Sequence, residues 1–170
     1  MKTIVVLIAF VMIVAGCSRS SKDTYEEAKT AEQQKNFPTA LEKYAQVVEK
    51  DGASAYAESS QYHIALIYNN ELREVGNAAV AYRKFYSLFP NSKDAATCLF
   101  LSGFIYNNDL KMHDTAKAIY NEFMQKFPNH ELVKSAQFEL QTMGKDPVDF
   151  LKKDSIVQAG TQPPAEKENE

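Results

Sequence analysis

A pattern that repeats every 38 residues constrains the fold of this chain more than any other feature of its sequence. The Ile-Tyr-Asn-Asn of residues 67–70 recurs at residues 105–108, and the Phe-Pro-Asn of residues 89–91 recurs at residues 127–129. Recurrence at a fixed spacing of 20–50 residues is typical of architectures in which one supersecondary unit stacks on the next. The chain is therefore expected to fold as a row of similar units.

Each unit is predicted to be a pair of antiparallel helices. Small and aromatic side chains recur at positions i, i+4 and i+7 of the second helix, which places them in one apolar stripe. The three stripes are Ala40-Tyr44-Val47, Ala78-Tyr82-Phe85 and Ala116-Tyr120-Phe123. The first helices carry Ala28, Ala65 and Gly103 as small contact residues, and Gly52, Pro90 and Pro128 follow the second helices. No β-type alternation of useful length is present, so the fold class is predicted to be all-α.

These positions divide the chain into three hairpins and a cap. The helical domain is expected to span residues 22–152, with repeats at about 22–52, 53–90 and 91–128 and a C-terminal capping helix within 130–152. The first repeat is the most polar, as the outer face of a terminal repeat must be. Residues 153–170 have little apolar surface to bury, and we expect them to be disordered.

The N-terminus predicts export. Lys2 precedes an apolar run at residues 4–14, which would span only about 17 Å as a helix and is too short to cross a bilayer. The run ends in Val-Ala-Gly before Cys17, which resembles the lipobox of bacterial lipoproteins. This resemblance implies that residues 1–16 are a cleaved signal peptide and that Cys17 carries the lipid, including palmitate-type acyl chains. Residues 17–21 would then be a short linker. The alternative is an ordinary signal peptide.

The order of small and aromatic residues resembles the tetratricopeptide (TPR) pattern. In the third unit it runs small, aromatic, small, aromatic and proline at Gly103, Tyr106, Ala116, Tyr120 and Pro128. The unit of 38 residues and the lipobox together are similar to the envelope TPR lipoproteins of the outer-membrane assembly (BamD-like) and Tol-Pal accessory (YbgF-like) groups. The resemblance implies a TPR-like α-solenoid that binds proteins.

The same resemblance implies a partner-binding groove on the concave face. Three residues before each small position the first helices and the cap carry an aromatic ladder, which comprises Tyr25, Tyr62, Phe100 and Phe138. Leu66, Phe104, Asn69 and Asn107 are expected on the same side. Aromatic anchors and amide groups suit a segment of a partner protein. The alternatives are that the ladder is inter-helix packing and that the asparagines are helix C-caps.

Composition argues against several other classes of function. The chain has a net charge of −3 and no clustered Lys/Arg segment, so no nucleic-acid partner is expected. His63, His113 and His130 show no metal-ligand spacing, and no catalytic motif is present. Cys98 has no basic neighbour and is expected to be a small buried residue. The protein is not expected to be an enzyme or to bind a metal or cofactor other than its covalent lipid.

These observations together predict a lipid-anchored adaptor that binds a protein partner in the bacterial cell envelope. Ser18, not aspartate, follows the lipidated cysteine, which by resemblance to proteobacterial sorting favours the outer membrane facing the periplasm. The partner would then act in outer-membrane assembly, division or secretion. Two alternatives remain open at this point: a binder of a non-protein envelope component such as peptidoglycan, and a structural homo-oligomer.

Overall fold

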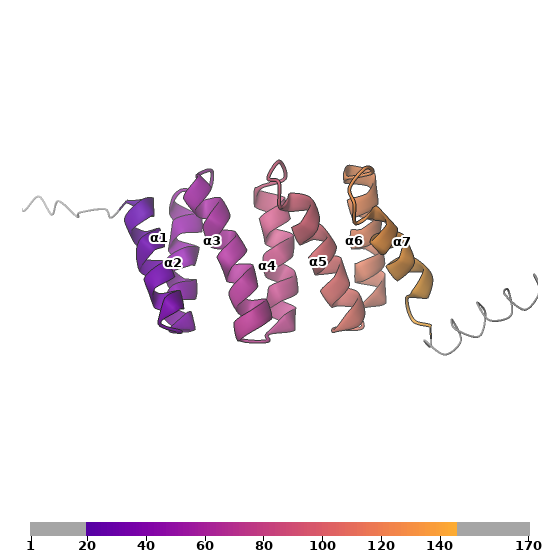
Figure 1. Cartoon of the computed structure of the whole chain (residues 1–170), viewed down its shortest axis with the longest axis horizontal. Helices are drawn as coiled ribbons and strands as arrows, with labels where there is room; N and C mark the ends of the chain where they lie inside the picture. Colours follow the sequence, from indigo (N-terminus) through magenta and orange to yellow (C-terminus); the bar gives the residue numbers. More distant parts are fainter. Residues whose placement is uncertain (1–19, 146–170) are drawn as a thin grey trace, which may run out of the picture.

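The computed structural model describes residues 20–145, and the predicted all-α, TPR-like solenoid is confirmed there (Figure 1). Successive helices stand side by side in sequence order, from α1 at one end of the long axis to α7 at the other. The elements are α1 (Ser21–Gln33), α2 (Phe37–Lys50), α3 (Ala55–Leu66), the π-helix η1 (Ile67–Glu71), α4 (Val75–Leu88), α5 (Ala95–Asn108), α6 (His113–Lys126) and α7 (Val133–Thr142). They form three antiparallel hairpins followed by a single helix.

The helices α1, α2 and α3 begin where the sequence supplies N-caps. The Ser20 hydroxyl accepts a hydrogen bond from the Asp23 N–H at 3.1 Å, and the Ser54 hydroxyl accepts one from the Ala57 N–H at 3.1 Å. Asn36 caps α2 in the same way, with a proline in the first turn. Each cap satisfies a backbone donor that a helix start would otherwise leave unpaired.

The hydrophobic core lies along the stripes that the repeat predicted. All nine stripe residues of α2, α4 and α6 are buried. The core has three neighbouring clusters that join successive hairpins, since Ile67 of the second hairpin packs in the cluster of the first, and Cys98 and Ile105 of the third pack in the cluster of the second. Helices α5 and α6 approach each other closely at Gly103 of α5. A Cβ atom there would lie 3.1 Å from Ile119 Cγ2 and 3.1 Å from Tyr120 Cε1, both on α6. Glycine is favoured at this position because a methyl group would fit only if the Ile119 and Tyr120 side chains moved by a few tenths of an ångström.

The turn inside each hairpin contains a feature that the sequence did not reveal. Lys35, Arg73 and Lys111, which are 38 residues apart, have φ values of 58°, 57° and 56°. Residues with a side chain rarely adopt this left-handed conformation, which glycine or asparagine usually supplies after a helix. In the second and third turns the N–H of the following residue returns to a helix carbonyl, from Glu74 to Tyr68 at 2.9 Å and from Met112 to Tyr106 at 2.8 Å.

Several predicted segments are shorter in the structure or lie outside it. The helix of the predicted cap 130–152 begins only at Val133, because residues 127–133 form turns closed by hydrogen bonds from His130 N–H to Phe127 O and from Val133 N–H to His130 O. Residues 146–152, the signal peptide, Cys17 and the tail 153–170 fall outside the described residues. Within residues 20–145 no helix combines the length and apolar character needed to span a membrane.

Candidate functional site: a groove between α5 and α7

Three of the four ladder aromatics pack between helices. The Tyr25 ring centroid lies 5.5 Å from that of Tyr56 and 6.2 Å from that of His63, so this ring joins α1 to α3. The half-buried Tyr62 ring lies 5.7 Å from Phe85 on α4. These two residues therefore contribute to packing, as the alternative interpretation expected.

Phe100 is a core residue of the third hairpin. It is 8% exposed, and its ring centroid lies 5.6 Å from Tyr120 and 5.7 Å from Phe123, both on α6. Its other neighbour is Phe104 on the next turn of α5, with 6.3 Å between ring centroids and 30° between planes. Phe100 can form the floor of a site but cannot be an accessible anchor.

Phe104 and Phe138 are the exposed members of the predicted set, at 38% and 51%. Together with Phe100 they line a groove of about 490 Å³ between α5 and α7. Lys134, Ser135 and Glu139 of α7 complete its lining. The structure thus brings together three of the predicted site residues, and it adds charged side chains that the repeat pattern did not mark. An aromatic floor with charged groups at the rim suits an apolar side chain of another protein.

The buried Asn107 is engaged within the molecule. Its Nδ2 atom donates to Glu139 Oε2 at 2.8 Å, and its Oδ1 atom lies 2.9 Å from His113 Nδ1. The neighbouring Asn108 donates to the same Glu139 oxygen at 3.0 Å. Both amides hold α7 against the end of α5, and they position Glu139 and Phe138 at the groove.

The corresponding residues of the second hairpin are not part of this groove. Asn69 and Leu66 are half-buried, and the Asn69 Nδ2 atom donates to Asn70 Oδ1 at 2.7 Å. The predicted site residues of the first two hairpins therefore pack or pair locally, whereas Phe100, Phe104 and Phe138 line a groove and Asn107 bonds to Glu139 beside it.

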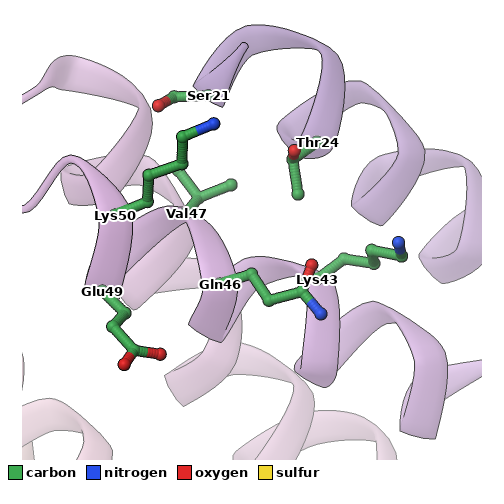
Figure 2. Close-up of a pocket in the computed structure, with 7 residues that line it drawn as sticks. All are labelled: Ser21, Thr24, Lys43, Gln46, Val47, Glu49 and Lys50. Carbon is green, nitrogen blue, oxygen red and sulfur yellow. The ribbon is translucent and has the colours of Figure 1, made fainter. Parts of the chain in front are cut away.

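The opposite end of the stack has a different, polar hollow of about 550 Å³ between the first turn of α1 and the last turns of α2. Figure 2 shows Lys50 extending toward Ser21, while Glu49 points away from the two α1 side chains. Lys43, which also lines the hollow, lies 3.2 Å from Glu27 in an ion pair. This surface has mixed charge and no aromatic anchor, which agrees with a solvated terminal face.

The titratable side chains inside the stack are buried or bonded to neighbouring residues. Burial raises the pKa of the Cys98 thiol to about 12, so the thiol stays protonated and unreactive at neutral pH. The Tyr44 hydroxyl donates to Glu32 at 2.6 Å, and His63 Nδ1 lies 3.0 Å from the same carboxylate while its ring stacks on Tyr44. Among residues 20–145 no group of three His, Cys, Asp or Glu side chains could hold a metal ion.

Comparison with known families agrees with this architecture. Residues 59–92 and 97–130 each match the model of a tetratricopeptide repeat. The two matches begin in α3 and α5 and end just after α4 and α6, so they coincide with the second and third hairpins. The sequence matches no curated protein. Tetratricopeptide repeats generally mediate protein–protein interaction, and the chain shares the scaffold that does so.

Proposed function

From its tetratricopeptide repeats and its N-terminal sequence, we propose that this chain is a lipid-anchored adaptor of the bacterial cell envelope. Its helical stack binds a protein partner on the periplasmic side of the outer membrane, in assembly, division or secretion. The chain acts by holding a partner near the membrane, without chemistry of its own.

The observation that carries the proposed binding role is the groove between α5 and α7. Phe104 and Phe138 both expose part of a large apolar ring to the groove, and burial of the exposed half of such a ring by a partner contributes about 1 kcal/mol. Lys134 lies beside them and offers a charge that can select an acidic neighbour of the incoming side chain. Rings exposed in this way are a frequent site of protein association.

The lipid anchor is supported by the lipobox that ends in Cys17. Ser20 is already the N-cap of α1, so only about 10 Å of extended chain would separate the lipidated residue from the first helix. An anchor this short would keep the polar end of the stack close to the bilayer, and the α5/α7 groove lies at the opposite end of the stack.

The binding role is tested by crosslinking from membranes with paired variants. Phe104→Ala/Phe138→Ala removes both exposed rings without opening the core, whereas Val80→Ala trims another exposed apolar residue, on α4. We expect a defined envelope protein to crosslink to wild type and to Val80→Ala, and to be lost with the double variant while its circular dichroism is unchanged. Retention of the same protein by the double variant would reject the groove.

The two alternative functions give different results in the same set of samples. A homo-oligomer would show a concentration-dependent mass in sedimentation that the double variant reduces. A glycan binder would sediment with purified peptidoglycan from which protein has been removed.

The anchor is tested separately by metabolic labelling with palmitate. We expect label on the wild-type chain and none on Cys17→Ala, together with loss of membrane association. Labelling that persists in Cys17→Ala would reject lipidation at this residue, without bearing on the groove.

A further inference from the structure

A second groove lies on the other side of α7, where this helix meets α6. It has a volume of about 400 Å³ and is lined by His113, Asp114, Lys117, Asn121, Leu140 and Met143. The α6 residues lie within positions 113–121, Leu140 lies in the last turn of α7, and Met143 directly follows α7. The groove is thus a gap in the last interface of the stack.

The earlier interfaces show what the gap lacks. Counted by the repeat of 38 residues, Met143 corresponds to Ile105 and Ile67, which are 4% and 0% exposed. At those positions the first helix continues for another turn, through Asn108 in α5 and through η1 after α3. The helix α7 ends at Thr142, so Met143 is only half-buried and the first turn of α6 is left open.

The chain leaves α7 in the direction of this gap. Met143 has an extended ψ of 123°, and Gly144 has a φ of +70°, which turns the backbone out of the helix. A Cβ atom built on Gly144 would lie 3.9 Å from His113 Cδ2, so the turn passes over the edge of the groove. Residues that follow Lys145 therefore begin next to the groove.

The sequence that follows has the composition to fill it. Residues 146–151 are Asp-Pro-Val-Asp-Phe-Leu, and the apolar members lie three to six residues beyond Lys145. An extended chain of that length reaches about 10–20 Å, which covers the groove. The segment also carries Asp149, which complements Lys117 on the groove wall.

We propose that residues 146–151 pack into the α6/α7 groove, with Phe150 and Leu151 against Leu140 and Met143. The segment replaces the missing helical turn and closes the last interface from within the same chain. This surface is then withdrawn from partners. The inference does not depend on the proposed envelope function.

The accessibility of residue 143 tests this packing. The full chain carries Met143→Cys with Cys17→Ser, and the remaining thiol, Cys98, is fully buried. We expect a thiol reagent to label position 143 about tenfold faster when Phe150→Ser/Leu151→Ser is added. The control Ile156→Ser/Val157→Ser changes the same chemistry outside the proposed segment and should leave the rate unchanged. Equal rates in all three chains would overturn the proposal.

A disulfide trap distinguishes the occupants of the groove. Leu140→Cys/Leu151→Cys should oxidise to an intrachain disulfide at any protein concentration, while Leu140→Cys/Ala159→Cys should not. A crosslinked dimer, or protection of position 143 that disappears on dilution, would show that a second copy covers the groove and would overturn the proposal. An unchanged thermal transition between the labelled chains confirms that a difference in rate is local.

Discussion

The second and third hairpins contain the same Ile-Tyr-Asn-Asn, at residues 67–70 and 105–108, but these residues have different partners. In the second hairpin they belong to the π-helix η1, and the Asn69 amide donates to Asn70. In the third they end α5, and both amides donate to Glu139 on α7. The helix that follows the second hairpin is α5, and its residue at the position of Glu139 in the 38-residue repeat is Leu101. The neighbouring helix, and not the motif, therefore decides what the asparagines do.

What the two copies share is the closing turn. The Leu72 N–H donates to Ile67 O and the Leu110 N–H donates to Ile105 O, both at 3.0 Å and both five residues back. Hydrogen bonds between residues five apart define a π-helical turn, which occurs mostly as a single turn within a helix and is frequent at functional sites. In the second and third hairpins this π-helical turn ends the first helix, and the next residue, Arg73 or Lys111, has a left-handed backbone conformation.

The largest expected difference concerns the small contact residue, which is Ala65 in the second hairpin and Gly103 in the third. Gly103→Val should lower the free energy of unfolding by about 3 kcal/mol, since even its first carbon would meet Ile119 and Tyr120 at 3.1 Å. Urea denaturation followed by circular dichroism measures this. Ala65→Gly is the matched exchange, and it should cost about 1 kcal/mol through helix propensity. A Gly103→Val chain as stable as wild type would show that α5 and α6 can move apart.

The same substitution in the two motif copies should give unequal losses. Asn107→Ala removes hydrogen bonds to a carboxylate and to His113 at a buried position, and we expect a loss of about 2 kcal/mol. Asn69→Ala removes a bond to an exposed neighbour and should change the stability by less than about 0.5 kcal/mol. Hydrogen exchange should also show faster opening of α7 in Asn107→Ala alone. Equal losses in the two variants would contradict the role assigned to Glu139.

Alkaline pH probes the aromatic stripe of the second hairpin. Burial raises the pKa of Tyr82 to about 12 from a usual value of 10.0, so the folded state keeps a proton that the unfolded state releases. The stability that this group contributes is complete below pH 10 and is lost as the pH rises from 10 to about 12. Tyr82→Phe should reduce the slope of stability against pH in this range by up to about 1.4 kcal/mol per unit. An unchanged slope would mean that Tyr82 is accessible to water.

The smallest predicted effect concerns the turn residues Arg73 and Lys111, where the same substitution should change stability equally in the second and third hairpins. Arg73 and Lys111 have a left-handed backbone, which is unfavourable for a residue with a Cβ atom, so replacing either with glycine removes this strain. Glycine also loses more conformational entropy on folding, which offsets part of the gain in stability. We expect each substitution to raise stability by about 0.5 kcal/mol, as judged by the urea midpoint. If one substitution raised the stability and the other lowered it, one of the two side chains would make a stabilising contact.

The repeat made most of the fold predictable because each core position occurs three times in the sequence. Ala40, Tyr44 and their counterparts at 38-residue spacing are buried for the same reason in every hairpin. The turns were less predictable, since Lys35, Arg73 and Lys111 are not residue types that favour a left-handed conformation.

The candidate site was predictable only in part because identical ladder positions have different neighbours. Phe100 is covered by α6, whereas Phe138 lies on the last helix of the stack and is half exposed. The bond between Asn107 and Glu139 joins residues 32 apart in sequence, and no periodic pattern marks it. Sequence periodicity identifies the faces of helices, but not what lies opposite each face at the end of a stack.

The slight anchoring of α7 has a mechanical consequence. Within residues 20–145, Ala136 is the only buried residue of this helix, whereas every other α-helix buries at least three residues. Without residues 146–151, the joint between α7 and the rest of the described stack is therefore the weakest in the series of hairpins. If the stack is pulled from its two ends, the load passes through each joint in turn, and this one yields first. A partner bound in the groove between α5 and α7 would contact both helices of this interface. Occupancy of the groove would therefore strengthen the stack at the point where it would otherwise break.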